Sequence, residues 1–205
     1  MKSLYAAVLL SLAFSACMQP ARAQEVDAYF GLGEARDRSN GQQIDTFGDK
    51  TLHATPRLGG VSTDFGLNFF FNKQVGIGWT GSWRWTSSDY AGLTYQYSFH
   101  TFDGIYQPSQ LRTKRVSPEF RAGIGVAGVH FGFDDQQACD QVPGCPSSHF
   151  FLAHAAGAAR LYLTSHIFVR PAVDVHYVNH FFPFGSHWAP RYSMSVGYSF
   201  GRESE

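Results

Sequence analysis

Carboxylates and arginines that share strand-like segments are the groups in this chain with the clearest chemical potential. Asp64 and Asp174 each lie where large apolar residues alternate with small or polar ones, so they could act as acid and base if the fold joined them. Arginines at equivalent positions favour ion pairing over proton transfer. We therefore predict a structural polar network, composed of Asp64, Arg84, Glu119, Arg121, Arg160, Arg170, Asp174, His176 and Arg191.

Nucleophilic chemistry at His176 is a second candidate. The stretch His176-Tyr-Val-Asn179 loosely resembles the arrangement of lipid A deacylases, in which a strand histidine activates a serine two residues further on the same face. Here Val178 takes the serine position, so no oxygen nucleophile is present. We expect no catalytic residue, and an outer-membrane enzyme acting on lipid A or peptides is the less favoured alternative.

Histidine and cysteine could also bind a metal, but their spacing does not favour it. His154 and His176 fall on the same predicted faces as the charged residues, without metal-ligand spacing and a supporting carboxylate. Cys139 and Cys145 lie close together in a polar stretch and are predicted to form one disulfide in an oxidising compartment. We expect no metal and no cofactor.

The N-terminal segment predicts secretion. A basic residue precedes the apolar run 4–14, and small residues flank a cleavage point after Ala23, as in a signal peptide. We predict a signal peptide over 1–23 and one mature domain over 24–205. An alternative lipoprotein box would acylate Cys17, but the small-residue cleavage pattern matches better. The apolar run is too short to cross a bilayer as a helix.

The composition differs from that of an ordinary soluble domain. Charged residues make up 16% of the chain and aromatic residues also 16%, with 21 glycines and a formal net charge of zero. Soluble domains carry about 25% charged residues. Neutrality gives no reason to expect a nucleic-acid partner.

Strict alternation is clearest in the last strand-like segment, where large apolar residues share one face and Ser193, Ser195, Gly197 and Ser199 share the other. This pattern is typical of a strand with lipid outside and a crowded polar lumen inside. The large residues, which would form the assembly signal of the barrel, are Tyr192, Met194, Val196, Tyr198 and Phe200. Eight such segments are expected, at residues 26–32, 61–71, 75–85, 93–100, 119–126, 149–163, 167–177 and 192–200.

Connection lengths give an independent prediction of topology. Tight turns follow the second and sixth segments, and longer polar connections follow the first, fifth and seventh. Outer-membrane barrels have short periplasmic turns and long outer loops, so both termini should be periplasmic and the cysteines should lie outside. The fourth strand is expected to end at Asp103-Gly104, and a bulge is expected near Gly128, where the alternation changes phase.

A soluble sandwich also alternates, but here the non-aromatic face holds the charges. In an eight-stranded barrel side chains fill the interior, so these charges should pair and plug the lumen. Trp and Tyr settle at membrane interfaces. Those expected near the outer edge are Trp83, Trp85, Tyr90, Trp188 and Tyr192.

The hairpin Phe69-Phe-Phe-Asn-Lys-Gln-Val-Gly-Ile-Gly78 and the final strand ending Tyr198-Ser-Phe200 resemble small eight-stranded outer-membrane β-barrels, similar to the transmembrane domain of outer-membrane protein A. The resemblance implies an all-β, antiparallel, up-and-down transmembrane barrel in a Gram-negative outer membrane. It also implies three partners: the lipid bilayer, lipopolysaccharide and the barrel assembly machinery. In those families the final aromatic usually ends the chain, whereas residues 201–205 follow it here.

Three functions are compatible with this pattern. The favoured one is a non-enzymatic barrel with a plugged lumen, whose external loops serve surface interaction or envelope integrity. The alternative is a narrow porin-like channel for small solutes, in which the excess of inward arginine would modestly favour anions. The sequence names no ligand for the loops.

Overall fold

The computed structural model describes residues 25–36, 43–45, 50–90, 93–132, 147–179, 181 and 186–201. The predicted signal peptide, Cys17, Cys139, Cys145 and the tail after Gly201 lie outside the described residues. No helix in these ranges is long and apolar enough to cross a membrane.

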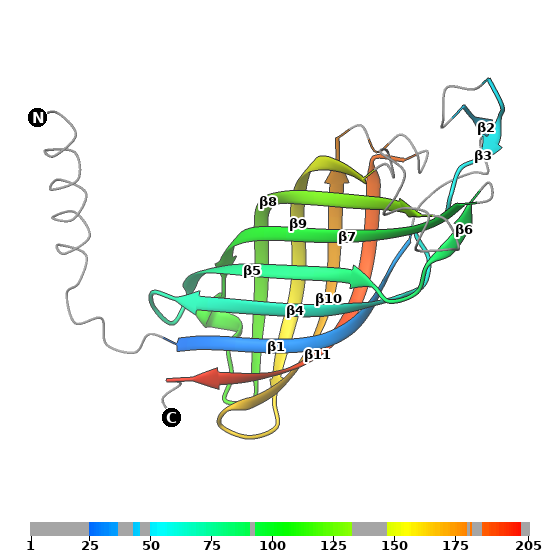
Figure 1. Ribbon diagram of the computed structural model, residues 1–205. Coiled ribbons are helices and arrows are strands. Elements are labelled where there is room, and N and C mark those ends of the chain that lie inside the picture. Colours follow the sequence, from blue (N-terminus) through cyan, green and yellow to red (C-terminus); the bar gives the residue numbers. More distant parts are fainter. Residues whose placement is uncertain are drawn as a thin grey trace, which may run out of the picture.

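Long antiparallel strands make up the molecule (Figure 1). β6 (Ser88–Tyr90) extends one edge by pairing with β7, and the short strands β2 (Gln43–Ile44) and β3 (His53–Ala54) form a separate hairpin. A single 3-10 turn, η1 (Ser109–Leu111), is present in the described ranges. The eight long strands are β1 (Glu25–Ala35), β4 (Val61–Phe70), β5 (Val75–Arg84), β7 (Leu93–Tyr106), β8 (Val116–Gly132), β9 (Ser147–Tyr162), β10 (Ile167–Val178) and β11 (Trp188–Phe200).

The eight long strands close into a barrel. Each pairs with its neighbour in the chain, β1 also pairs with β11, and the β5–β7 pairing leaves the ring without an open edge. Closure matters because an open edge in lipid would leave backbone groups without partners. The predicted eight-stranded up-and-down antiparallel barrel is confirmed.

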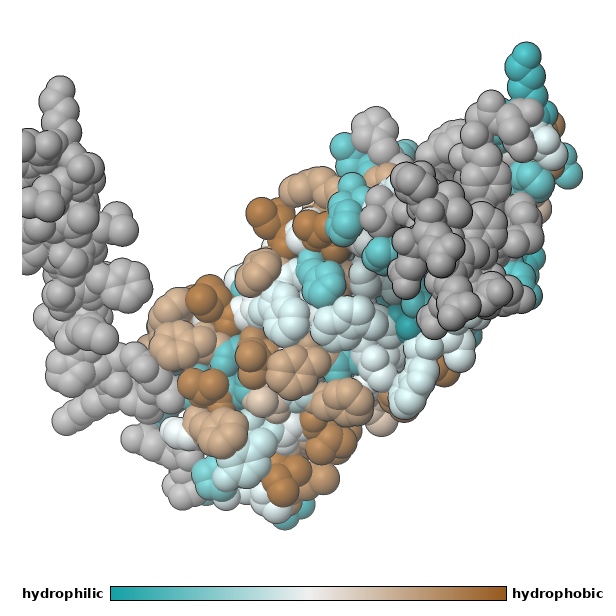
Figure 2. Space-filling view, in the orientation of Figure 1, coloured by the Kyte–Doolittle hydropathy of each residue, from teal (hydrophilic) through white to brown (hydrophobic). Residues whose placement is uncertain are grey.

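Alternation along the strands sets the two faces of the wall. In β11, Ser195 and Ser199 are buried, whereas Met194 is 62% exposed and Phe200 55%. The same period exposes Phe30 on β1 and Phe102 on β7. Figure 2 shows apolar side chains spread over the visible wall of the barrel, with many hydrophilic residues toward the end from which β2 and β3 project. An apolar surface of this extent is suited to lipid and not to water.

Strand lengths correct two details of the prediction. β7 does not end at Asp103-Gly104 but continues to Tyr106, because Asp103 keeps the inward phase of the strand. No bulge occurs at Gly128, since β8 keeps one continuous register with both neighbours through that residue. The sequence pattern changes there because inward positions turn from polar to apolar, while the period stays the same.

Candidate functional site

The lumen is the part of the molecule where charged side chains meet, and Glu119 on β8 is the centre of its periplasmic half. Glu119 is fully buried. Its Oε1 lies 2.5 Å from Nε of Arg121 and 3.1 Å from Nη2 of Arg170, and its Oε2 accepts from Nε of Arg160 at 2.7 Å. One carboxylate thus joins guanidinium groups from β8, β9 and β10, so each charge in this dry region has an opposite charge beside it.

Arg160 links this centre to the first strand. It forms an ion pair with Asp27, and its Nη1 lies 3.5 Å from Oε1 of Glu25. The guanidinium carbon also lies 4.7 Å from the ring centre of Phe70 and 5.3 Å from that of Phe168. Cation–π contacts of this kind are strongest when the cation is desolvated.

Tyr29 fills the cross-section beside these charges. Its cross-strand partners are Gly66 and Gly197, and a Cβ at Gly66 would overlap the Tyr29 ring. The missing side chains therefore provide the space that the ring occupies. The Tyr29 hydroxyl accepts from Nη1 of Arg121 at 3.0 Å, and Arg170 lies 4.8 Å above the ring.

His154 on β9 bridges two carboxylates in the middle of the lumen. Its Nδ1 is 2.7 Å from Oδ1 of Asp103, and its Nε2 is 3.2 Å from Oδ1 of Asp174. Arg191 extends the chain of contacts: its Nη1 lies 3.3 Å from Oδ2 of Asp174, and its Nη2 pairs with Asp64. Alternating charges thereby tie five strands together, namely β4, β7, β9, β10 and β11. Thr101 Oγ1 also donates to Asp103 at 2.9 Å.

His176, the histidine of the nucleophile hypothesis, points into the lumen. Its ring stacks on His154 at 4.8 Å and on Phe99 at 4.6 Å between ring centres, and its Nδ1 is 3.2 Å from the carbonyl oxygen of Ala189. Val178 is fully buried within an apolar cluster. The position that a nucleophile would take therefore presents hydrocarbon.

The outer end of the lumen is apolar, which the expectation of a polar interior did not include. Leu58 and Phe181, from the connections at this end, are buried with side chains of the barrel wall. This set, called the outer cluster below, consists of Ala35, Leu58, Tyr95, Tyr97, Phe99, Ala127, Val129, Leu152, Val178, Phe181 and Ala189.

Arg84 lies at the border of the outer cluster. It donates to Ser88 Oγ, and its guanidinium carbon is 5.1 Å from the ring centre of Tyr95 and 5.6 Å from that of Tyr97. Of the five arginines predicted for the polar network, it is the one without an ion pair to a carboxylate within the described ranges.

The other predicted network residues form two groups, one around Glu119 and one around His154. The structure adds three carboxylates that the predicted network omitted, Glu25, Asp27 and Asp103. Asp103 shares the phase of Phe99 and Thr101. Because an apolar face is expected to point toward lipid, alternation alone could not have placed Asp103 in the lumen. Glu25 lies one residue before the predicted start of the first strand, so the predicted network does not include it.

Aromatic residues mark the outer edge of the wall as expected from sequence. Trp83 is 39% exposed, Trp85 68% and Trp188 53%, and Tyr192 is also exposed. The Tyr90 side chain lies outside the described set. Within the described residues no group of three His, Cys, Asp or Glu could hold a metal ion.

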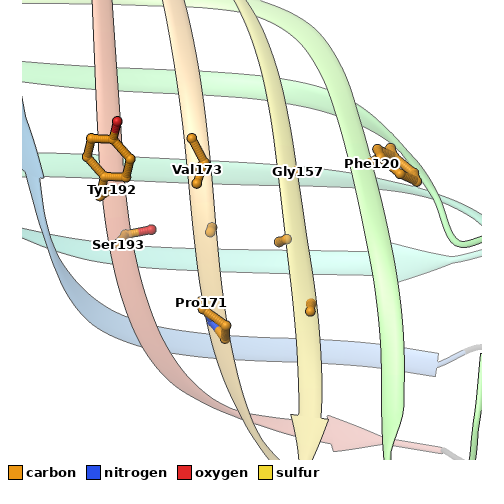
Figure 3. A pocket seen from close by; sticks show the side chains of 9 residues that line it. Phe120, Gly157, Pro171, Val173, Tyr192 and Ser193 are labelled. Atoms are coloured by element: carbon orange, nitrogen blue, oxygen red, sulfur yellow. The ribbon is translucent and has the colours of Figure 1, made fainter.

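A hollow of about 470 Å³ lies on the outer wall over β9, β10 and β11 (Figure 3). Gly157 and Ala159 form part of its floor, and Phe120 and Tyr192 stand on opposite sides. Its lining residues are mostly apolar and none is charged, so it offers a surface for hydrocarbon.

A closed ring of eight antiparallel strands, apolar outside and charged within, defines a small outer-membrane β-barrel. Solved structures agree. The chain is similar to Ail, the attachment invasion locus protein of Yersinia pestis, in complex with the heparin analogue sucrose octasulfate, at 11% identity and a TM-score of 0.54 over 87% of this chain and 99% of that one. It is also similar to the N-terminal β-barrel domain of Pseudomonas aeruginosa OprF, at 13% identity and a TM-score of 0.52 over 89% of this chain and 100% of that one.

At these identities the likeness concerns the fold, and the predicted resemblance to small outer-membrane barrels is confirmed at that level. No protein-family model and no curated protein matches the chain. An apolar wall around a closed sheet is stable in a bilayer, which places the barrel in the outer membrane. The short turns 71–74 and 163–166 lie at the end where β1 begins and β11 ends. Outer-membrane barrels have their short turns in the periplasm, so this end is the periplasmic one.

Proposed function

We propose that this protein is a non-enzymatic outer-membrane barrel with a plugged lumen, whose outer connections serve surface interaction or envelope integrity. The observation that carries the proposal is the content of the lumen: paired charges centred on Glu119 and His154, followed by the outer cluster. Removal of residues 1–23, a Cys139–Cys145 disulfide and recognition of β11 by the barrel assembly machinery are parts of the same proposal.

Planar-bilayer recording of the purified, refolded protein tests the plug. We expect no steady conductance from the wild type, whereas replacing Phe99 and Leu58 by Ser should produce one, because both side chains belong to the outer cluster. Heat-modifiable migration on a gel confirms folding of both proteins beforehand. A steady single-channel conductance from the folded wild type would refute the plugged lumen.

A narrow channel is the second candidate, supported by polar residues that extend from Glu25 to Arg191 through the periplasmic half of the lumen. It requires the outer cluster to open. If the wild type conducts, anion selectivity that falls in Arg84→Gln would favour this candidate.

The enzymatic alternative is disfavoured by the surroundings of His176, whose ring is enclosed between His154 and Phe99. Mass spectrometry of lipid A from cells that express the protein provides the test. Loss of an acyl chain that also requires His176 would overturn the non-enzymatic proposal.

A further inference from the structure

The periplasmic turns carry a concentrated positive charge, most of which lies outside the lumen network. Lys73 lies in the β4–β5 turn, and Arg112, Lys114 and Arg115 lie in the β7–β8 turn. These turns are neighbours, because β5 pairs with β7 from Val75 opposite Tyr106 onward. We call these four residues the basic patch.

Hydrogen bonds hold the two turns together. Arg112 donates from Nη1 to the carbonyl oxygen of Lys73 at 2.9 Å, and the backbone N of Gln107 donates to the carbonyl oxygen of Gln74 at 2.7 Å. Arg112 also lies 3.8 Å from Glu25, so it serves mainly to position the patch. Lys73, Lys114 and Arg115 are exposed on this fixed base.

The backbone of each turn is itself tied down. Asn72 Oδ1 accepts from the backbone N of Gln74 and of Val75, both at 2.8 Å. Thr113 Oγ1 accepts from the backbone N of Val116 at 3.0 Å. The three exposed cations therefore project from ordered turns, which lowers the entropic cost of binding an anion there.

Charge is distributed unevenly between the two ends of the barrel. The three periplasmic turns, 71–74, 107–115 and 163–166, contain four basic and no acidic residues. The connections at the other end, 36–60, 85–92, 133–146 and 179–187, contain four basic and seven acidic residues. The net charge of zero therefore conceals a positive periplasmic end.

Apolar side chains surround the basic patch. Leu111 belongs to the same turn and is 58% exposed, and Phe71, Tyr106 and Phe120 are each about half exposed beside it. A leucine in a turn is suited to acyl chains, and aromatic residues settle at the level of lipid headgroups. The cations therefore stand at the height of the phosphates of the membrane leaflet.

We propose that the basic patch binds anionic phospholipid headgroups in the periplasmic leaflet, so that the barrel selects phosphatidylglycerol-type lipids from among neutral ones. The proposal rests on the orientation of the barrel described above, which places this end at the periplasmic leaflet. Basic residues at a membrane surface attract anionic lipid, with an effect of about fivefold in affinity for each cation near the headgroups.

Spin-labelled lipids provide the test in vesicles that contain the refolded full chain. We expect labelled phosphatidylglycerol to associate with the wild type at least about fivefold more strongly than labelled phosphatidylcholine, which is the effect of a single cation. Combined Lys73→Gln, Lys114→Gln and Arg115→Gln should reduce the ratio to about one. The matched control, with Arg36, Lys50 and Arg57 changed to Gln at the other end, should keep the wild-type ratio.

Several results would overturn the proposal. A wild-type ratio near one, or an unchanged ratio in the patch variant, excludes a lipid site. If the patch variant no longer sediments with purified cell-wall sacculi but keeps the lipid selectivity of the wild type, the patch binds acidic cell-wall peptides instead. If the patch variant does not fold, the wild type is tested at about 0.5 M sodium chloride, which should abolish its lipid selectivity by screening. Selectivity that persists at this salt concentration refutes the proposal. Failure of the wild type to show heat-modifiable migration would instead refute the membrane barrel itself.

Discussion

Replacing Glu119 by Gln should destabilise the barrel strongly, because this carboxylate balances three guanidinium groups. Gln keeps the shape but removes the charge, and Arg121 and Arg170 then have no other carboxylate contact within the described residues. Arg160 retains Asp27. Breaking a buried ion pair costs about 3–5 kcal/mol, since it leaves an uncompensated charge. With two arginines affected, we expect the free energy of unfolding to fall by at least about 3 kcal/mol.

Urea unfolding in lipid vesicles, followed by tryptophan fluorescence, measures this loss, and the temperature of the heat-modifiable gel shift provides a second readout. The matched control is Glu34→Gln, whose pair with Arg36 at 3.4 Å is exposed on both sides. It should change stability by less than about 1 kcal/mol. If Glu119→Gln stays within about 1 kcal/mol of the wild type, the charged lumen does not stabilise the barrel and the reasoning fails.

Three further predictions concern space, assembly and closure. Gly66→Ala should lower the free energy of unfolding by about 1–3 kcal/mol, because the new methyl would overlap the Tyr29 ring. The control is Gly157→Ala, where a Cβ meets nothing within 4 Å; it should be nearly neutral in the same urea titration. Phe200→Ala should reduce the folded fraction in outer-membrane extracts, judged by the unboiled gel band, if β11 carries the assembly signal; normal yield would exclude that role for its last aromatic. Leu58→Ser alone should raise the leak of a small dye from vesicles if this loop residue helps to close the mouth, and an unchanged leak would remove it from the plug.

Period-two alternation predicted the eight strands because in a closed barrel every strand has one face toward lipid and one toward the lumen. In β11 the prediction holds residue by residue, since the exposed and the more buried residues alternate in the predicted phase from Tyr192 to Phe200. Contacts across the lumen could not be predicted in the same way, since His154 on β9 contacts Asp103 on β7, a strand that is not its neighbour in the sheet.

The apolar outer cluster was missed for a different reason. Alternation identifies which residues share a face, but it does not say that a face keeps one polarity along its whole length. Ala127 and Val129 are inward residues of β8 in an unbroken register, yet their apolar character after the inward Arg121 suggested a change of phase. The change of pattern at Gly128 therefore reflects a change from polar to apolar surroundings, and the backbone has no bulge there.

That change of environment explains why one barrel contains two kinds of interior. On β7, Phe102 faces outward at 66% exposure while Asp103 beside it is buried. Toward the outer end of the same strand the outward residue Gln96 is polar and exposed, and the inward residues Tyr97 and Phe99 are apolar. A wall in lipid is apolar outside, whereas a wall in water must bury its apolar face. The outward side chain changes from apolar at Phe102 to polar at Gln96, so the outer limit of the hydrocarbon layer lies between these two residues. Below it, ion pairs connect the strands across the lumen, and above it the outer cluster forms a conventional hydrophobic core.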